Sequence, residues 1–233
     1  MPPSWEDTYD EAQKKTEDTR RKMFIDAVRE KIPAIDPDLA FLTPTEILQA
    51  QRFDPRIMEY HERIRDYVGE GKRIGLLFPD ADRKPWSKDK TDSLIYRNLF
   101  TSLKNLKVED QVAIYTISPV LGVVPREWYE EIPMYDGSGA LSFMVRRRGL
   151  SWNPDDFRVV ISNAADILVD FLEKNHERCE KWHVLFRSPS VHKRIFEVAM
   201  DKKPFPIWPH PSKKSLSDSY LKMRTTLKEI FEG

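Results

Sequence analysis

The sequence predicts an α/β fold, in which a mainly parallel four-stranded sheet has helices on both faces and follows a set of N-terminal helices. Short apolar runs alternate with stretches whose apolar residues recur at helical spacing, and this alternation is typical of strand–helix–strand units. Pro, Gly and Asp bound the apolar runs, as expected for strands that end in turns. The expected strands span 73–78, 111–117, 181–187 and 205–208.

Helical spacing of apolar residues accounts for most of the remaining chain. The expected helices span 17–31, 44–53, 55–68, 91–104, 154–174, 190–201 and 216–231. The best-marked start is Thr43-Pro44-Thr45-Glu46, which offers a capping hydroxyl, a proline in the first turn and a glutamate three residues after the cap. Residues 120–154 show no clear pattern, and a connection of that length inside a domain is commonly functional.

We expect two parts in the chain. Residues 1–51 form an N-terminal helical extension, and residues 52–233 form the α/β core domain. With 233 residues, the chain is long enough to bury a substantial core.

Charge and cysteine content exclude several classes of protein. Lys plus Arg and Asp plus Glu both number 38, so no overall field attracts nucleic acid, and a polyanion has to meet a local patch. The single cysteine, Cys179, excludes an internal disulfide framework and a Cys-based zinc site. The histidines show no metal-ligand spacing. We therefore expect no metal and no cofactor.

The chain shows no sign of a membrane or secretory segment. No apolar run approaches the roughly 20 residues that a membrane span needs. The N-terminus is acidic and lacks the apolar core of a signal peptide. We expect a cytoplasmic protein without membrane contact.

Polar side chains directly follow the first predicted strand, where open α/β sheets bind their ligands. Asp80 and Lys84 are the candidate catalytic residues. Asp80 suits a general base with Asp82 as its neighbour, and Lys84 suits contact with a phosphate or a base carbonyl. Trp86 suits stacking on a base. The structural alternatives are a turn aspartate bound to backbone N–H groups, a solvated loop lysine and an apolar plug. Both interpretations remain open.

Two later segments add candidates for nucleic-acid binding. Arg126 offers a guanidinium for a phosphate or carboxylate, although it also suits the start of a helix together with Glu127. Arginines beside an aromatic residue favour phosphate contact plus base stacking, and here they are Arg146, Arg147 and Arg148 with Trp152. A solvated charge run is the alternative. We expect His183 and His192 to be packed or surface histidines.

Two segments resemble the core domain of archaeosine synthases, archaeal tRNA-modifying enzymes related to tRNA-guanine transglycosylases. They are GKRIGLLFPDADRKPWSKDKTD (71–92) and TISPVLGVVPREWYEEIPMYDGSG (116–139). The resemblance covers about residues 52 to 230 and implies a uracil-DNA-glycosylase-like fold. It further implies tRNA as a partner, with a separate transglycosylase-type protein as a second one. The family's reaction adds an amine to the nitrile of a deazaguanine base in tRNA.

The family's signature runs Pro-Cys, three residues, Lys-Pro-Tyr, two residues, Ser, two residues, His. Here Pro79, Lys84 and Pro85 match. The Cys, Tyr, Ser and His positions hold Asp80, Trp86, Asp89 and Asp92. The resemblance thus implies a substrate-binding set, which comprises Pro79, Pro85, Trp86, Asp89, Asp92, Pro125, Arg126, Tyr135 and Asp136.

A carboxylate at Asp80 cannot form the thioimide that a thiol at this position would form. We therefore predict a tRNA-modification protein with a diverged site. One alternative is a nucleobase glycosylase or nucleotide hydrolase that uses Asp80 as its base, by analogy of fold. The other is a catalytically silent interaction module, which the absence of the Cys, Ser and His favours. A cleft that converges on Asp80, Lys84 and Trp86 would indicate ligand binding, whereas a site filled by Trp86 would indicate silence.

Overall fold

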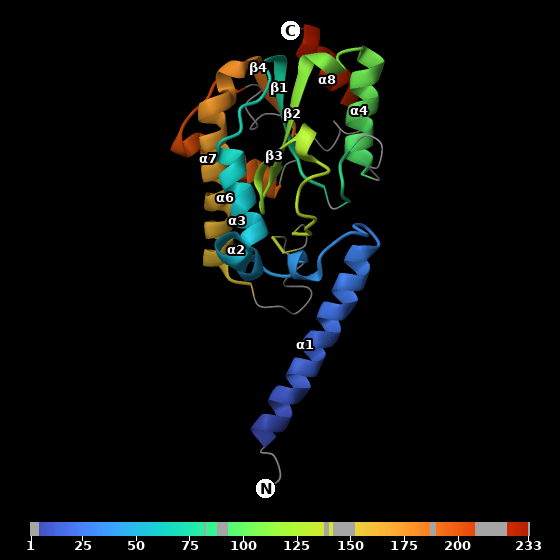
Figure 1. The fold of residues 1–233 in the computed structure, drawn as a ribbon, viewed down its shortest axis with the longest axis vertical. Coiled ribbons are helices and arrows are strands. Elements are labelled where there is room, and N and C mark those ends of the chain that lie inside the picture. Colours follow the sequence, from blue (N-terminus) through green and yellow to red (C-terminus); the bar gives the residue numbers. More distant parts are fainter. Residues whose placement is uncertain are drawn as a thin grey trace.

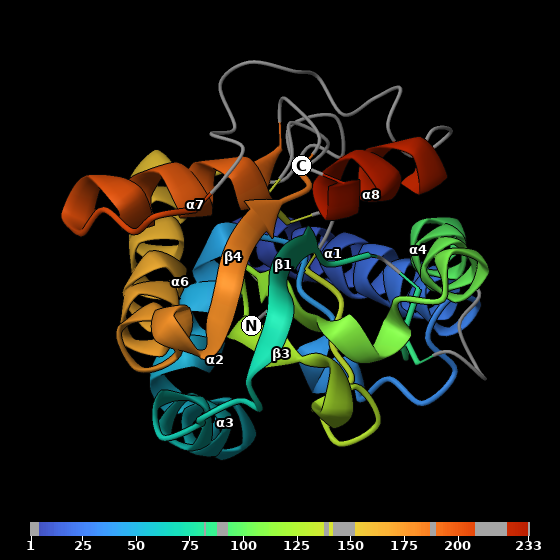
Figure 2. The same ribbon diagram turned by 90° about the horizontal axis from the view of Figure 1, so that it is seen from above.

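A four-stranded sheet lies between two layers of helices (Figures 1 and 2). The structure is a computed structural model that describes residues 5–81, 83–87, 93–137, 140–141, 152–186, 190–207 and 223–232, without the side chains of 5–15 and 17. The strands are β1 (Lys72–Pro79), β2 (Val112–Ser118), β3 (Gly122–Pro125) and β4 (Cys179–Val184). They lie in the order β3-β2-β1-β4, and only β3 runs antiparallel to its neighbour.

The predicted α/β class with a mostly parallel sheet is confirmed, but one strand was wrong. The fourth strand is β3, in the segment that showed no pattern. Of the predicted strand 205–208, residues 205–207 form only an isolated bridge between Ile207 and Trp182, and residue 208 lies outside the described residues. From Ile74 onward the central strand β1 is apolar because helices cover both of its faces, and Leu76, Leu77 and Phe78 are fully buried.

Except for α1 (Trp5–Arg29), the helices form the two outer layers. They are α2 (Pro44–Phe53), α3 (Pro55–Arg65), α4 (Leu94–Leu106), α6 (Pro154–Asn175), α7 (Val191–Lys202) and α8 (Met223–Glu232). Short 3-10 turns are η1 (Pro37–Leu39), η2 (Glu109–Gln111), η3 (Arg126–Trp128) and η4 (His176–Arg178). Figure 2 shows α2, α3, α6 and α7 on one side of the sheet and α4 with α8 on the other. No helix within the described residues combines the length and apolar character needed to cross a membrane.

The helix starts predicted at residues 44, 55 and 154 are confirmed by their caps, whereas the helix predicted from residue 17 already begins at Trp5. Thr43 accepts the N–H of Glu46, and Asn153 accepts the N–H of Asp155. Asp54 ends α2 and caps α3 by accepting the N–H of Arg56. These side chains satisfy N–H groups that a helix start leaves without partners.

The N-terminal helix α1 projects away from the rest of the molecule (Figure 1). Its carboxyl end is anchored by a small apolar cluster of Val28, Ile32, Ile35 and Ala40. By contrast, Phe41 and Ile47 belong to the same buried cluster as the strands. The domain boundary at residue 51 stays a prediction, while packing joins the segment around Phe41 and α2 to the core.

Strand β4 contains a buried histidine. His183 is 6% exposed, and within the described residues neither of its ring nitrogens has a hydrogen-bond partner. Burial, together with the positive charge of Lys181, lowers the pKa of His183 from 6.5 to about 4. The unfolded chain therefore takes up a proton at a higher pH than the folded chain does, and the folded state loses stability as the pH falls from about 6.5 towards 4.

The variant His183→Phe should remove this pH dependence, since phenylalanine keeps a ring without titrating. Between pH 7 and pH 5, the native chain should lose about 1–2 kcal/mol more unfolding free energy than the variant does. Urea denaturation at the two pH values measures this difference. Equal losses for the two proteins would contradict the assignment to His183.

Candidate functional site

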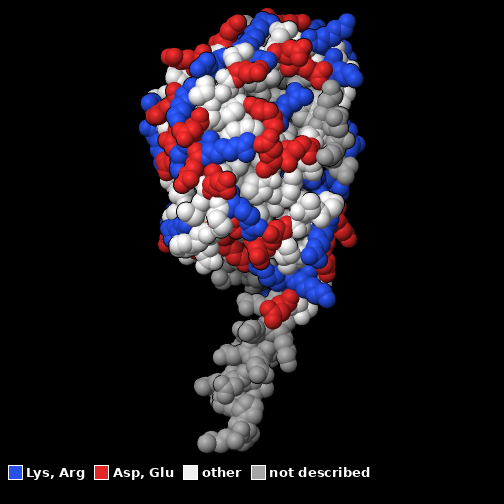
Figure 3. Space-filling model, viewed as in Figure 1, with Lys and Arg blue, Asp and Glu red and all other residues white. Residues whose placement is uncertain are grey.

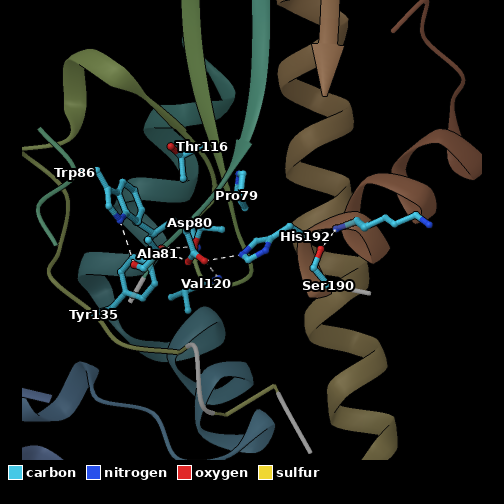
Figure 4. A network of polar contacts seen from close by, with 12 residues as sticks. Pro79, Asp80, Ala81, Trp86, Thr116, Val120, Tyr135, Ser190 and His192 are labelled. Carbon is cyan, nitrogen blue, oxygen red and sulfur yellow. Dashed lines mark hydrogen bonds and ion pairs between the residues drawn. The ribbon is translucent and has the colours of Figure 1, made fainter. Parts of the chain in front are cut away.

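The candidate site lies at the carboxyl end of the central strand (Figure 4). Asp80 follows β1 directly, and its backbone N–H donates to the Ile117 carbonyl at 3.0 Å. This bond continues the pairing of β1 with β2 and fixes the direction of the Asp80 side chain, which is only 9% exposed. The position is the edge of the sheet where open α/β folds bind ligands.

Two side chains from distant parts of the chain bind the Asp80 carboxylate. His192 Nε2 lies 2.6 Å from Oδ1 of Asp80, and the Tyr135 hydroxyl donates to Oδ2 at 3.0 Å. His192 lies in the first turn of α7, which Ser190 caps by accepting the N–H of Lys193. Because β1 and β4 are parallel neighbours, the helix that follows β4 starts at the same edge as Asp80. Both carboxylate oxygens thus have a partner.

The environment keeps Asp80 ionised. Burial by itself would raise the pKa of this carboxyl. The charge and hydrogen bond of His192, the charge of Lys84 and the Tyr135 hydroxyl outweigh burial and lower the pKa of Asp80 below its ordinary value. Asp80 is therefore a carboxylate at neutral pH.

Lys84 is a buried cation beside this carboxylate. It is 5% exposed, and its Nζ donates to the Ala81 carbonyl at 3.0 Å. The Nζ atom also lies 4.3 Å from the ring centroid of Tyr135 and 5.1 Å from that of Trp86, at cation–π distance. The solvated-lysine alternative is therefore wrong.

Trp86 fills the interior and does not line an open site. Its side chain is 0% exposed and stacks on Tyr96, with ring centroids 5.5 Å apart. The indole Nε1 donates to the Ala81 carbonyl at 3.1 Å. No face of the indole is open to a base, so the stacking role predicted for Trp86 is wrong, and the apolar-plug alternative is confirmed.

Hydroxyl groups fix Tyr135. Its single proton goes to Asp80, so Ser118 must donate to the Tyr135 oxygen. The Ser118 Oγ in turn accepts the backbone N–H groups of Val120 and Leu121. Burial, and then the negative charge of Asp80, raise the pKa of Tyr135 well above its ordinary value. Tyr135 therefore stays protonated and keeps donating to Asp80.

A second hydroxyl chain supports the turn after β1. The Tyr96 hydroxyl donates to the Pro79 carbonyl at 2.9 Å and lies 2.6 Å from the Thr116 hydroxyl. Thr116 also lies 2.6 Å from the Tyr129 hydroxyl. Pro79 is thus a structural neighbour of the site, and Pro85 follows the buried Lys84 through a cis peptide bond.

The structure does not bring Pro125 and Arg126 to Asp80. Strand β3 runs antiparallel to β2, so it carries both residues back towards the amino ends of the parallel strands. There the Arg126 guanidinium lies 4.7 Å from the Phe100 ring centroid and lines a hollow of about 410 Å³ together with Lys72. Of the predicted substrate-binding residues Pro125, Arg126, Tyr135 and Asp136, only Tyr135 is seen to bind the Asp80 carboxylate.

Asp136 has a structural role through its backbone. Its N–H donates to the Leu39 carbonyl at 3.0 Å, and its own carbonyl accepts the Phe41 N–H at 2.8 Å. Asp136 is buried. It joins the N-terminal segment to the chain that carries Tyr135.

Several predicted site residues lie outside the described part of the chain. They are Asp89, Asp92, Arg146, Arg147 and Arg148, together with Asp82. Trp152 is described; it is partly buried and packs 5.2 Å from Phe157. On the face shown in Figure 3, Lys and Arg alternate with Asp and Glu and form no large patch of one charge.

His192 is the site residue that sequence reasoning missed. It lies 112 positions after Asp80, and no local motif marks it. The available signal was the position of His192 in the first turn of the helix that follows β4. Such a residue lies at the same edge of the sheet as the residues that follow the neighbouring parallel strand.

The thiol of this chain does not belong to the site. Cys179 pairs with Lys72 at the start of β1, the end of the sheet opposite to Asp80. Cys179 is buried, and burial raises the pKa of its thiol. Among the described residues, no three His, Cys, Asp or Glu side chains are grouped to hold a metal ion.

Comparison with known proteins adds one structural similarity. No family model matches the sequence, and no curated protein is similar to it. A solved structure described as "Crystal structure of AF0587, a protein of unknown function" is similar at 22% sequence identity with a TM-score of 0.44. The similarity covers 72% of this chain and 48% of that one, so this chain spans about half the length of that protein.

Proposed function

We propose that the chain is a tRNA-modification protein, related to archaeosine synthase as the resemblance implies, which acts on a nucleobase at the Asp80 site. The observation that supports this best is the buried pair of Asp80 and His192 at the carboxyl end of the central strand. A carboxylate that orients an imidazole is suited to proton transfer. A separate transglycosylase-type protein belongs to the proposal as the partner that inserts the base.

In this proposal the histidine meets the substrate and the aspartate positions it. Both oxygens of Asp80 already accept hydrogen bonds, so Asp80 is poorly placed to take a proton itself. Nε2 of His192 is bound to Asp80, which leaves Nδ1 for a ligand. The side chain of His192 is 14% exposed, enough for one edge of the ring to be reached.

Acid–base chemistry would replace the missing thiol. When a neutral amine attacks the nitrile carbon of a deazaguanine base, a C–N bond forms and one π bond of the nitrile breaks. The nitrile nitrogen then needs a proton, which a protonated His192 would supply, and the product is an amidinium. No covalent thioimide is needed on this route, which fits the remote position of Cys179.

The test is turnover on tRNA that carries the nitrile-bearing base, with a free amine present and nucleosides analysed by mass spectrometry. We expect His192→Gln and Asp80→Asn to lower the rate about 10²–10⁴-fold. Arg158→Ala, which changes an exposed side chain on α6, is the matched control and should leave the rate unchanged. Native protein that neither binds tRNA at low salt nor alters any nucleoside would contradict the proposal.

The same pair favours a second candidate, a nucleobase glycosylase or nucleotide hydrolase. Here His192 rather than Asp80 would activate the water, because the carboxylate oxygens are occupied. Release of free base from a nucleoside or from uracil-containing DNA, lost in His192→Gln, distinguishes this candidate. If the protein catalysed neither reaction, the silent interaction module would remain, and the buried position of Trp86 also favours it.

A further inference from the structure

A hollow separate from the Asp80 site lies between the edge strand β4 and helix α8. Its volume is about 400 Å³, and the described residues that line it come from β4, from α8 and from the segment that follows α7. Asp80, Lys84, Tyr135 and His192 are not among them. An inference about this hollow therefore does not depend on the proposed function.

The side chain of His183 points to the α8 side of the sheet. The preceding residue, Trp182, packs on the other side, where its ring centroid lies 5.4 Å from that of Tyr115 and 6.3 Å from that of Phe171 in α6. Successive residues of a strand point to opposite faces, so His183 faces the layer formed by α4 and α8 (Figure 2). Since His183 and Ile230 of α8 line the same hollow, the imidazole faces into it.

The imidazole of His183 is a buried polar group that lacks a partner in the described part of the chain. It is 6% exposed, and neither ring nitrogen takes part in a hydrogen bond there. Burial, together with the charge of Lys181, lowers the pKa of His183 to about 4. Near pH 7 the ring is therefore neutral and presents one N–H donor and one lone pair. Because a buried polar group without a partner costs free energy, a bound molecule is expected beside it.

The surroundings favour a neutral organic molecule over a single water or an ion. One water takes up about 30 Å³ in the liquid, far less than this hollow, whose volume lies in the range of small-molecule sites. Pro206 and Ile230 contribute apolar lining. The charged lining residues, Glu180, Lys181 and Glu229, are exposed and of mixed sign, so they do not select an ion of one charge.

We propose that this hollow binds a small neutral molecule that carries a hydroxyl group on an apolar ring. A hydroxyl group both donates and accepts, so it can pair with a ring nitrogen of His183 whether or not that nitrogen carries the proton. The apolar ring of the ligand lies against Pro206 and Ile230.

The experiment is a titration of the full chain with phenol at pH 7, followed by nuclear magnetic resonance of the histidine ring nitrogens. We expect saturable binding of one phenol per chain, with a shift of the His183 ring signals. Benzoate has a similar shape but carries a negative charge, which is costly to place in a partly apolar hollow beside Glu229. It should bind at least about tenfold more weakly than phenol.

A comparison of phenol with toluene, which lacks the hydroxyl group, isolates the hydrogen bond to His183. The ratio of phenol affinity to toluene affinity should fall about tenfold in His183→Phe, because the variant keeps a ring but offers no polar atom. Lys181→Gln is the matched control, since Lys181 lines the same hollow from the same face of β4 and is exposed. It should leave the ratio unchanged.

Three outcomes would overturn the proposal. The first is the absence of saturable phenol binding to the native chain, which would mean that the hollow holds ordered water only. The second is equal affinity for phenol and benzoate. The third is an affinity ratio that His183→Phe leaves unchanged or that Lys181→Gln lowers equally. The first two are measured on the native chain, so they do not depend on the folding of any variant.

Discussion

Replacing Trp86 by alanine should lower the free energy of unfolding by about 3–5 kcal/mol, the usual cost of removing a large buried aromatic side chain. The indole is fully buried and packs on two tyrosines, at 5.5 Å from Tyr96 and 5.3 Å from Tyr129 between ring centroids. The change also removes the ring beneath the Lys84 ammonium and the bond to the Ala81 carbonyl. Urea denaturation followed by far-ultraviolet circular dichroism measures the loss without relying on tryptophan fluorescence.

Trp86→Phe is the control for this prediction. It keeps an aromatic ring and removes only the indole N–H and part of the volume, so the loss should be about 1–3 kcal/mol. If Trp86→Ala cost less than Trp86→Phe, or cost almost nothing while ligand binding disappeared, the indole would be a ligand platform after all. The packing around Tyr96 argues against that result.

Most of the fold could be predicted from local patterns because most elements have local causes. Caps at Thr43 and Asn153 mark helix starts, and the apolar runs of β1 and β2 mark buried strands. The hairpin of β2 and β3 escaped prediction because β3 is only four residues long. Its one local signal is Gly122, which has a φ of +76° at the turn, a conformation that favours glycine.

Some residues of the candidate site could likewise be predicted from the sequence, and others could not. Asp80 and Lys84 could be predicted because position alone, at the end of a buried strand, marks them. The placement of Arg126 was wrong because an unrecognised antiparallel strand reverses the direction of the chain before it. His192 escaped because its contact with Asp80 depends on which strands are neighbours, and the sequence does not state the strand order.

Asp80→Asn should be as damaging as the loss of Trp86, at about 3–5 kcal/mol of unfolding free energy. The carboxylate lies between His192 and the buried ammonium of Lys84. The amide keeps the shape but leaves these groups in the interior without their negative partner, and that costs more than the pair itself contributes. Asp170→Asn, which breaks an exposed pair with Arg65, should cost at most about 1 kcal/mol under the same conditions.

The pH dependence and a double variant separate the buried pair from general damage at this position. Since the folded chain lowers the pKa of Asp80, the carboxylate stabilises the fold above its unfolded pKa of about 3.9, and this contribution disappears as the pH falls through the lower folded value. The difference in unfolding free energy between the native chain and Asp80→Asn should therefore become smaller in acid.

The loss caused by Asp80→Asn should also be smaller in a chain that already carries His192→Gln, because the effects of two residues that share one interaction are not additive. If the loss caused by Asp80→Asn did not change with pH, and if it added fully to the loss caused by His192→Gln, the two residues would not act as a pair. If the two stability effects were not additive and the double variant still had no turnover, the result would support a pair that serves both the fold and proton transfer.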